Sequence, residues 1–305
     1  MTYRELEWPI EGPMSARQDV LLWHDQGFNR MLDFHGDPVR SRLALFSDGN
    51  HHMALGACIE EFVARNPAVQ DVFYLTVPPN LYARILDRGA VRVGNLQLSV
   101  APEVLIGPSE AAQAWREQGR VAQTRAFARS CGNVLLVSAG NPKGIHGIAD
   151  LYRDDIRVFV SNPETEAASF RVYSETLARQ AGAQGLEGAA LRERLRTVSP
   201  RVMHGRHIHH RELPVALASG QADVAPVYHH LALRYLAIFP GRFEMIGLPG
   251  SGSGVPGRDG QVITEYHAGV LGSGGEYGQA FVDFLCSERG GELYRRHGLE
   301  VMPDG

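Results

Sequence analysis

From residue 40 onward, short apolar runs alternate with longer segments in which apolar residues recur every three or four positions. A short apolar run bounded by polar, Gly or Pro residues is typical of a buried strand, and the longer spacing is typical of an amphipathic helix. This alternation indicates a parallel sheet with crossover helices and therefore predicts an α/β fold. We expect strands at 42–46, 71–76, 103–106, 134–138, 156–160 and 223–227.

The segments between these runs predict the helices. Residues 1–40 are interpreted as an N-terminal extension with a helix near 16–32 and a turn at 35–38. The stretch 247–261 is rich in Gly, Ser and Pro but lacks the GK[ST] ending of a phosphate-binding loop, so a surface loop is expected. We expect helices at 51–64, 80–88, 109–118, 146–152, 167–181, 188–195, 212–219, 229–238, 276–287 and 288–297.

The stretch LFSDGNHHMALGACIEEF, residues 45–62, joins an apolar run to a helix through the polar turn 47–50. The start of a helix carries unpaired backbone N–H groups and the positive end of the helix dipole, which together suit an anion. An ordinary helix cap explains the same residues. The pattern alone leaves both interpretations open.

Composition excludes several classes of protein. The 305 residues suffice for two lobes, and a formal net charge of −4 with scattered arginines gives no support to nucleic-acid binding. No stretch reaches the roughly 18 apolar residues of a membrane span, so a membrane-embedded protein is not expected. Three widely separated cysteines in apolar runs indicate buried small hydrophobes rather than a disulfide framework, namely Cys58, Cys131 and Cys286.

The N-terminal residues lack the basic and apolar regions of a secretory signal. Two locations follow as alternatives: a periplasmic or other extracytoplasmic protein whose leader has been removed, or a cytoplasmic protein. No nucleophile elbow, H-E-x-x-H or dinucleotide-binding motif is present, so we expect no enzyme, no catalytic residues and no cofactor.

Four stretches, in order, resemble the molybdate- and tungstate-binding branch of the type II periplasmic solute-binding proteins. The first is the junction at 45–62. The second consists of DVFYLTVPPNLYARILDRGAV and PEVLIGPSEAAQAWREQGRV, which resemble the family's polar loop and helix followed by a strand and helix. The third is GNVLLVSAGNPKGIHGIADL with the following VFVSNPETEAASF, which resembles the family's crossing strand, turn-helix and ligand loop. ELPVALASGQADVAPVYHH and the C-terminal QAFVDFLCSERGGELYRRHGLEV resemble the hinge-side loop and the closing helices.

This resemblance implies a two-lobed type II periplasmic-binding-protein fold with a ligand cleft between the lobes. Residues 41–124 with 266–305 correspond to lobe one, and residues 125–265 to lobe two with the hinge crossings. It implies capture of a small oxyanion resembling molybdate or tungstate by hinge closure, with an ABC transporter permease as partner. A metal-binding protein, or a cytoplasmic sensor or enzyme that reuses the fold, is the alternative.

The resemblance also implies the ligand-binding residues. Ser47 and Thr76 match hydroxyl ligands, Val77 and Ala168 match backbone amide donors, and Tyr228 matches a phenolic donor. Asp48, Asn50 and Ser169 complete the predicted set. The chain departs from the family at Pro78 and Pro79, which remove two amide donors. It also departs at Glu164 and Glu166, and Glu166 is expected close to the anion position, where its charge would repel the ligand.

Two histidine pairs stand at these loops, His51 with His52 and His229 with His230. They suit an oxyanion as donors, or zinc, nickel or copper as ligands; alternatively one histidine of each pair faces solvent while the other packs or caps a helix. The denser run at 204–211 is expected to be a solvated loop. Metal chelation and donation of Arg206 or Arg211 to an anion are its alternatives.

Overall fold

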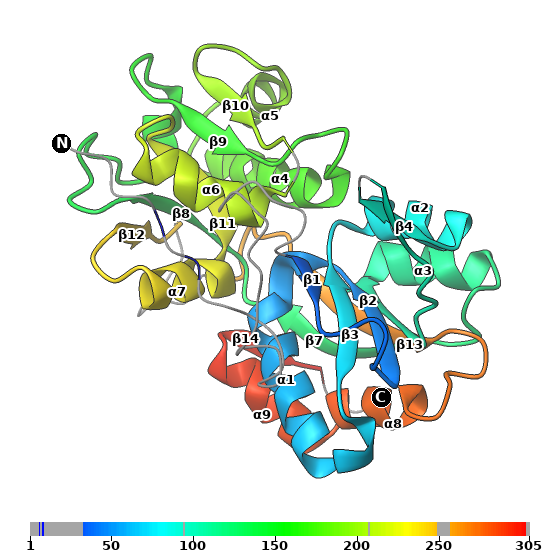
Figure 1. Ribbon diagram of the computed structural model, residues 1–305. Coiled ribbons are helices and arrows are strands. Elements are labelled where there is room, and N and C mark those ends of the chain that lie inside the picture. Colours follow the sequence, from blue (N-terminus) through cyan, green and yellow to red (C-terminus); the bar gives the residue numbers. More distant parts are fainter. Residues whose placement is uncertain are drawn as a thin grey trace. The chain divides into compact units, whose positions relative to one another are not determined.

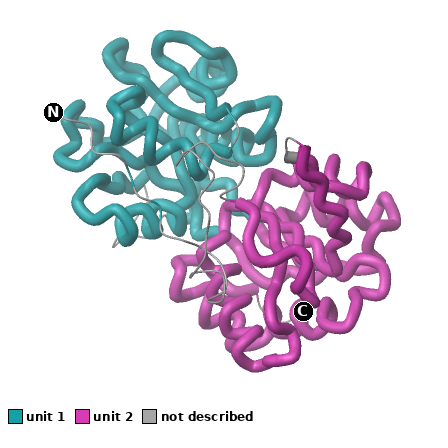
Figure 2. The backbone as a smooth tube through the Cα atoms, viewed as in Figure 1, with its two compact units in different colours: residues 1–9, 25–28, 130–264 teal, residues 10–24, 29–129, 265–305 magenta. Residues whose placement is uncertain are grey.

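The computed structural model describes residues 6, 8, 33–93, 95–206, 208–248 and 257–302. The expected helix at 16–32 and residues 249–256 of the expected loop lie outside them. The chain divides into two compact units (Figure 2). Unit 1 comprises residues 1–9, 25–28 and 130–264, and unit 2 comprises residues 10–24, 29–129 and 265–305.

Unit 2 contains a seven-stranded sheet in the order β1-β3-β2-β6-β13-β7-β14 (Figure 1). Strands β2, β3 and β6 run parallel, whereas β13 is antiparallel to both β6 and β7. A separate hairpin pairs β4 (Val91–Val93) with β5 (Leu96–Leu98). The sheet strands are β1 (Phe34–His35), β2 (Leu43–Ser47), β3 (Val72–Thr76), β6 (Val104–Pro108), β7 (Arg125–Ser130), β13 (Glu265–Val270) and β14 (Leu299–Val301).

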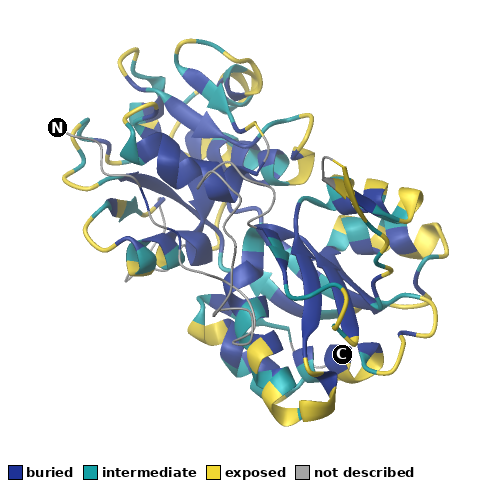
Figure 3. Ribbon diagram, in the orientation of Figure 1, coloured by how far each residue is buried: buried dark blue, intermediate teal, exposed yellow. Residues whose placement is uncertain are grey.

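Helices cover both faces of this sheet, which explains why its central strands are apolar at successive positions. Leu43 and Leu45 of β2 join one hydrophobic cluster with residues of α1, α8 and α9, while Ala44 and Phe46 of the same strand are buried outside that cluster. Figure 3 shows the central strands of this sheet as buried, with exposed residues on the helices around it. The helical segments of unit 2 are η3 (Gly49–His51), α1 (His52–Arg65), η4 (Pro67–Val69), α2 (Pro79–Arg88), α3 (Ser109–Glu117), α8 (Gly278–Leu285) and α9 (Glu288–Arg296).

Unit 1 contains a five-stranded sheet in the order β10-β9-β11-β8-β12. Strands β9, β10 and β11 are parallel, and β8 is antiparallel to β11 and β12. Gly188 lets helices α4 and α5 approach, because a Cβ there would lie 2.1 Å from the Ala178 carbonyl oxygen. The elements are β8 (Asn133–Ser138), η5 (Ile148–Tyr152), β9 (Val158–Val160), α4 (Ala167–Ala183), α5 (Gly188–Arg196), β10 (Val202–His204), α6 (His209–Ala218), β11 (Val224–Tyr228), α7 (His229–Ile238) and β12 (Phe243–Ile246).

The predicted α/β fold is confirmed, and each predicted strand and each predicted helix after residue 40 has a counterpart within a few residues. The expectation of parallel sheets is wrong in part, because β7, β8, β12 and β13 pair in antiparallel fashion. The segment expected as a helix at 146–152 is the 3-10 helix η5.

Part of the expected N-terminal extension belongs to the sheet of unit 2. Phe34 and His35 pair with Leu75 and Tyr74 of β3. The following turn requires glycine, because Gly36 has a φ of 78° and a Cβ there would lie 2.0 Å from the Val72 carbonyl oxygen.

Within the described residues from 33 onward, the chain passes between the units at two points, between Arg129 and Ser130 and between Thr264 and Glu265. Residues 125–129, expected in lobe two, lie in unit 2, because β7 pairs with β13. The two connecting segments are tied together: the Ser130 N–H donates to the Thr264 carbonyl, and the Thr264 N–H donates to Ser130 Oγ at 3.0 Å.

Candidate functional site

In unit 2, predicted site residues stand where parallel strands end and helices begin. Ser47 and Thr76 are opposite each other in the register of β2 and β3, each at the last position of its strand. No N-cap side chain bonds to the first turn of η3, α1 or α2. The carboxyl edge of a parallel sheet is the usual ligand-binding edge of open α/β folds.

Ser47 and Asp48 are joined to His51 in a buried network. Ser47 Oγ donates to the Asp48 carbonyl at 3.0 Å, and His51 Nε2 lies 3.0 Å from Asp48 Oδ1. His51 Nδ1 lies 2.8 Å from the Tyr294 hydroxyl, and burial raises the pKa of Tyr294 well above its ordinary value. Tyr294 therefore keeps its proton and can donate it to Nδ1, and the Nε2–H of His51 then faces Asp48.

The remaining predicted residues of this loop bond locally. Asn50 Nδ2 donates to Asp48 Oδ2 at 3.0 Å, and His52 Nδ1 lies 2.8 Å from the Gly49 carbonyl oxygen. The Val77 N–H, the predicted amide donor, donates to the Ser47 carbonyl at 3.0 Å. These contacts fix the two loops against each other.

A second buried network surrounds Thr76. Its hydroxyl donates to Asp33 Oδ1 at 3.0 Å, and His35 Nε2 lies 3.0 Å from the same hydroxyl oxygen. The His35 ring stacks on Tyr74 with centroids 4.3 Å apart. Asp33 and His35 were not among the predicted site residues.

In unit 1, the parallel strands β9, β10 and β11 are followed by helices α4, α6 and α7. Ala168 lies exposed in the first turn of α4, with Ser169 half-buried beside it, and the N-cap side chain makes no bond to that turn. Glu166 bonds elsewhere: its carboxylate accepts from the His209 N–H at the start of α6, at 3.0 and 3.1 Å. The charge expected to repel an anion is thus held by the N-terminus of another helix.

Tyr228 ends β11 and immediately precedes α7. Its hydroxyl lies 2.8 Å from Thr264 Oγ1, next to the point where the chain leaves unit 1. Its ring stacks on His230, with centroids 5.1 Å apart, and meets Tyr173 edge to face at 5.2 Å. The backbone N–H of His229 donates to the Gly132 carbonyl.

The expectation that one histidine of each pair faces solvent is wrong. His51, His52, His229 and His230 are all at most 4% exposed. His229 and His230 begin α7 directly after β11, whereas His51 ends η3 and His52 begins α1. No group of three or more His, Cys, Asp or Glu side chains suited to a metal is found among the described residues.

The run 204–211 was expected as a solvated loop, but among its described residues Gly205 and 208–211 are buried, while Arg206 is exposed. His204 ends β10, and α6 begins at His209. Arg211 is 2% exposed, and its guanidinium lies over the Trp8 ring at 4.9 Å. A cation–π contact is therefore one of the interactions that hold this arginine.

His209 is held neutral inside unit 1. Its ring stacks on Phe159 at 5.5 Å, and burial, with a smaller contribution from His210, lowers the pKa of His209 to about 3. The unfolded chain takes up this proton below pH 6.5, whereas the folded chain does not until near pH 3. Stability must therefore fall as the pH drops through this window.

The free energy of unfolding should fall between pH 7 and pH 5, and His209 should account for about 1 to 2 kcal/mol of that fall. Replacing His209 by phenylalanine is expected to make the fall smaller by this amount. Urea unfolding at the two pH values measures this difference. The control is His146→Phe, at an exposed position outside regular structure. An unchanged pH dependence in His209→Phe would contradict a neutral buried imidazole.

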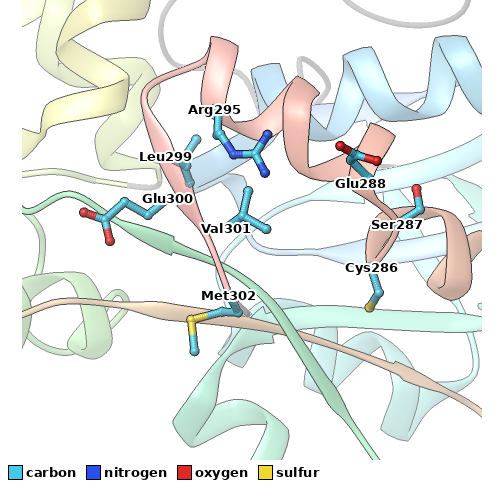
Figure 4. A pocket seen from close by; sticks show the side chains of 8 residues that line it. All are labelled: Cys286, Ser287, Glu288, Arg295, Leu299, Glu300, Val301 and Met302. Carbon is cyan, nitrogen blue, oxygen red and sulfur yellow. The ribbon is translucent and has the colours of Figure 1, made fainter. Parts of the chain in front are cut away.

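A separate pocket of about 570 Å³ lies in unit 2 at the end of α8, the start of α9 and β14 (Figure 4). None of the predicted site residues lines it. Glu300, which lines the pocket, forms a salt bridge with Arg129 at 2.7 Å, and both side chains are half-buried. It is lined by Cys286, Ser287, Glu288, Arg295, Leu299, Glu300, Val301 and Met302.

Sequence reasoning missed residues that complete these networks. Asp33 and His35 flank one apolar residue, too short a run to indicate a strand, and Tyr294 and Thr264 are far in sequence from their partners. The acidic and imidazole side chains around a lone Phe34 were the available signal.

None of the described helices is both long enough and apolar enough to span a membrane.

Comparison with known proteins decides the family. A model of the bacterial extracellular solute-binding protein family matches residues 43–300. The chain belongs to this family. A search of curated proteins finds no match to the sequence.

Solved structures similar to this solute-binding protein confirm its predicted two-lobed periplasmic-binding-protein fold. PEB3 of Campylobacter jejuni, bound to L-phospholactate, aligns with a TM-score of 0.61 at 15% identity over 85% of this chain and 99% of its own. The periplasmic molybdate-binding protein of Azotobacter vinelandii aligns with a TM-score of 0.59 at 15% identity, over 86% and 100%. Iron-bound HitA of Pseudomonas aeruginosa aligns with a TM-score of 0.56 at 16% identity, over 86% of each chain.

Proposed function

We propose that this solute-binding protein captures a small oxyanion outside the cytoplasm and delivers it to an ABC-type permease. In this proposal both units contribute to binding, and closure of the two lobes encloses the ligand. The observation that carries it is the placement of predicted ligand residues at the ends of strands, or in the first turn of a helix that follows a strand, in each unit.

The chemistry of these strand ends favours an anion. No N-cap side chain bonds to the first turn of α1, α2, α4 or α7, whose N-terminal N–H groups and dipoles suit negative charge. Ala168 is exposed in the first turn of α4, and the Glu166 carboxylate is bonded to α6 instead. Two of the similar solved structures, PEB3 with L-phospholactate and the molybdate-binding protein, are named for anionic ligands.

We assign the proposed roles as follows. Ser47 and Thr76 supply hydroxyl groups, Val77 and Ala168 supply amides, and Tyr228 supplies a phenol. The loop residues Asp48 and Asn50 shape the first loop, and Ser169 flanks Ala168. For several of these groups, ligand binding must compete with the internal hydrogen bonds described above.

A transition metal or metal complex is a second candidate, supported by the fold shared with iron-bound HitA and by the buried histidine pairs. In this candidate His51, His52, His229 and His230 contribute imidazole nitrogens. Neutral imidazole is a common ligand of such metals.

A thermal-shift measurement on the metal-stripped protein separates the two candidates. Phosphate, sulfate, molybdate, tungstate, zinc, nickel, copper and iron are added singly, with chloride at matched ionic strength as the control. We expect an oxyanion to raise the melting temperature, because a ligand at a hundredfold excess over its Kd stabilises the folded state by about 2.7 kcal/mol. Stabilisation by metals alone would favour the second candidate, and stabilisation by none of them would contradict both.

A further inference from the structure

The Thr76 hydroxyl already donates its proton to another side chain of the protein. A hydroxyl has one hydrogen to donate, and that of Thr76 goes to Asp33 Oδ1 at 3.0 Å. His35 Nε2, 3.0 Å from the same oxygen, must therefore be the donor in its own contact. The result is a chain of hydrogen bonds from His35 through Thr76 to Asp33, in which the Thr76 oxygen keeps one further lone pair to offer.

Ser47, opposite Thr76 in the strand register, is in a similar state. Its hydroxyl proton goes to the Asp48 carbonyl, and the carboxylate of Asp48 is buried in the same loop. The last residues of β2 and β3, Ser47 and Thr76, thus each have an oxygen lone pair available and a buried carboxylate nearby. While it makes that internal bond, a hydroxyl oxygen of this kind can accept a hydrogen bond from a ligand but not donate one.

Asp33 and His35 lie outside the part of the chain that the family model matches, which begins at residue 43. They reach Thr76 because β1 adds to the edge of the sheet beside β3. The stacking of His35 on Tyr74 fixes the direction of its ring. The segment before residue 43 therefore adds two polar side chains of this chain's own to a family ligand position.

We propose that the Asp33–His35 pair selects a tetrahedral oxyanion that keeps a proton at neutral pH, hydrogen phosphate or hydrogen arsenate, over one that has none. The ligand O–H donates to Thr76 Oγ1, whose own proton points to Asp33. This inference rests on the proposed function and names the class of oxyanion for the same site.

The selectivity follows from repulsion as much as attraction. Sulfate, molybdate and tungstate carry no proton at neutral pH, so each would place an oxygen lone pair against that of Thr76. A site built to accept a hydroxyl proton rejects an analogue that lacks it, because two acceptor oxygens then face each other without a hydrogen between them.

Isothermal titration of the full chain at pH 7 with inorganic phosphate, arsenate, sulfate and molybdate tests the preference. We expect phosphate and arsenate to bind at least ten times more tightly than sulfate and molybdate. Equal or tighter binding of sulfate or molybdate would overturn the inference and leave the proposed oxyanion function standing. Binding of none of the four would overturn both.

Asp33→Asn tests the residue itself, since it keeps the size of the side chain and removes its charge. We expect the ratio of phosphate to sulfate affinity to fall at least tenfold. The matched control is Asp37→Asn, the same change four residues away, where the side chain caps the Val39 N–H and not Thr76; its ratio should equal that of the unchanged protein. An unaltered ratio in Asp33→Asn would refute the proposal.

Thr76→Val provides a second variant that does not depend on the folding of Asp33→Asn. It removes the oxygen that accepts the ligand proton while keeping the shape of the side chain. The phosphate-to-sulfate ratio should again fall at least tenfold. A Thr76→Val protein with a native melting transition and the original preference would overturn the inference.

Discussion

Replacing Tyr228 by phenylalanine is expected to weaken binding of the proposed oxyanion by about 10- to 100-fold. A hydrogen bond to a charged group contributes about 1.5 to 3 kcal/mol, and each 1.4 kcal/mol corresponds to a tenfold change in Kd. The ring itself should stay in place, because it is packed against His230 and Tyr173. Isothermal titration with the tightest oxyanion of the thermal-shift series gives the change in Kd.

Two controls separate the phenol's roles. Tyr173→Phe removes the hydroxyl of the adjoining buried tyrosine and should leave the Kd within about twofold, a change well under 1.4 kcal/mol. Thr264→Val removes the hydroxyl group that Tyr228 contacts but leaves the phenol. If Thr264→Val weakened binding as much as Tyr228→Phe, Tyr228 would act only through the connecting segment, and its proposed role as ligand donor would be wrong.

Replacing Asn133 by alanine is expected to lower the free energy of unfolding by about 2 to 4 kcal/mol, because a buried network loses its central member. Asn133 Nδ2 bonds Thr176 Oγ1 at 3.0 Å and Gln261 Oε1 at 3.2 Å. Thr176 Oγ1 in turn accepts the Val262 N–H at 3.0 Å. These bonds tie β8 and α4 to the segment through which the chain returns to unit 2.

Urea unfolding of Asn133→Ala measures this loss. Asn66→Ala is the matched control: its side chain makes a single bond, to the Phe62 carbonyl at the end of α1, in a half-buried position. We expect the control to lose about 1 kcal/mol or less. A loss of the same size in both variants would show that the Asn133 network contributes no more than one ordinary hydrogen bond.

The strands that the sequence predicted share one physical property. Residues 43–47, 72–76 and 104–108 are buried at every position, so they appear as unbroken apolar runs whatever their neighbours are. Strands with one polar or partly exposed face, such as β7 and β13, show a weaker signal and were not predicted. Their antiparallel pairing depends on partners distant in sequence.

The candidate site divides in the same way. The positions of Ser47 and Tyr228 at strand ends, and the start of α4 near Ala168, followed from local pattern and from resemblance to the solute-binding family. Their hydrogen-bond partners did not. Tyr228 meets Thr264 across 36 positions, and His51 meets Tyr294 across 243.

Glu166 and Arg211 show why local charge misled. Both are charged residues in polar segments, where exposure is the usual expectation. Glu166 is buried because its carboxylate accepts hydrogen bonds from the His209 N–H at the start of α6, and the Arg211 guanidinium is covered by Trp8. Neither partner is near in sequence.

The sequence by itself determined the α/β class, the order of most elements and the strand ends at which the candidate site lies, because hydrophobic periodicity is a local consequence of burial. Only the tertiary structure decided strand direction, the burial of all four paired histidines and the placing of Asp33 and His35 beside Thr76. Those outcomes depend on which distant segments pair, and a polar side chain takes its role from the partner it meets there.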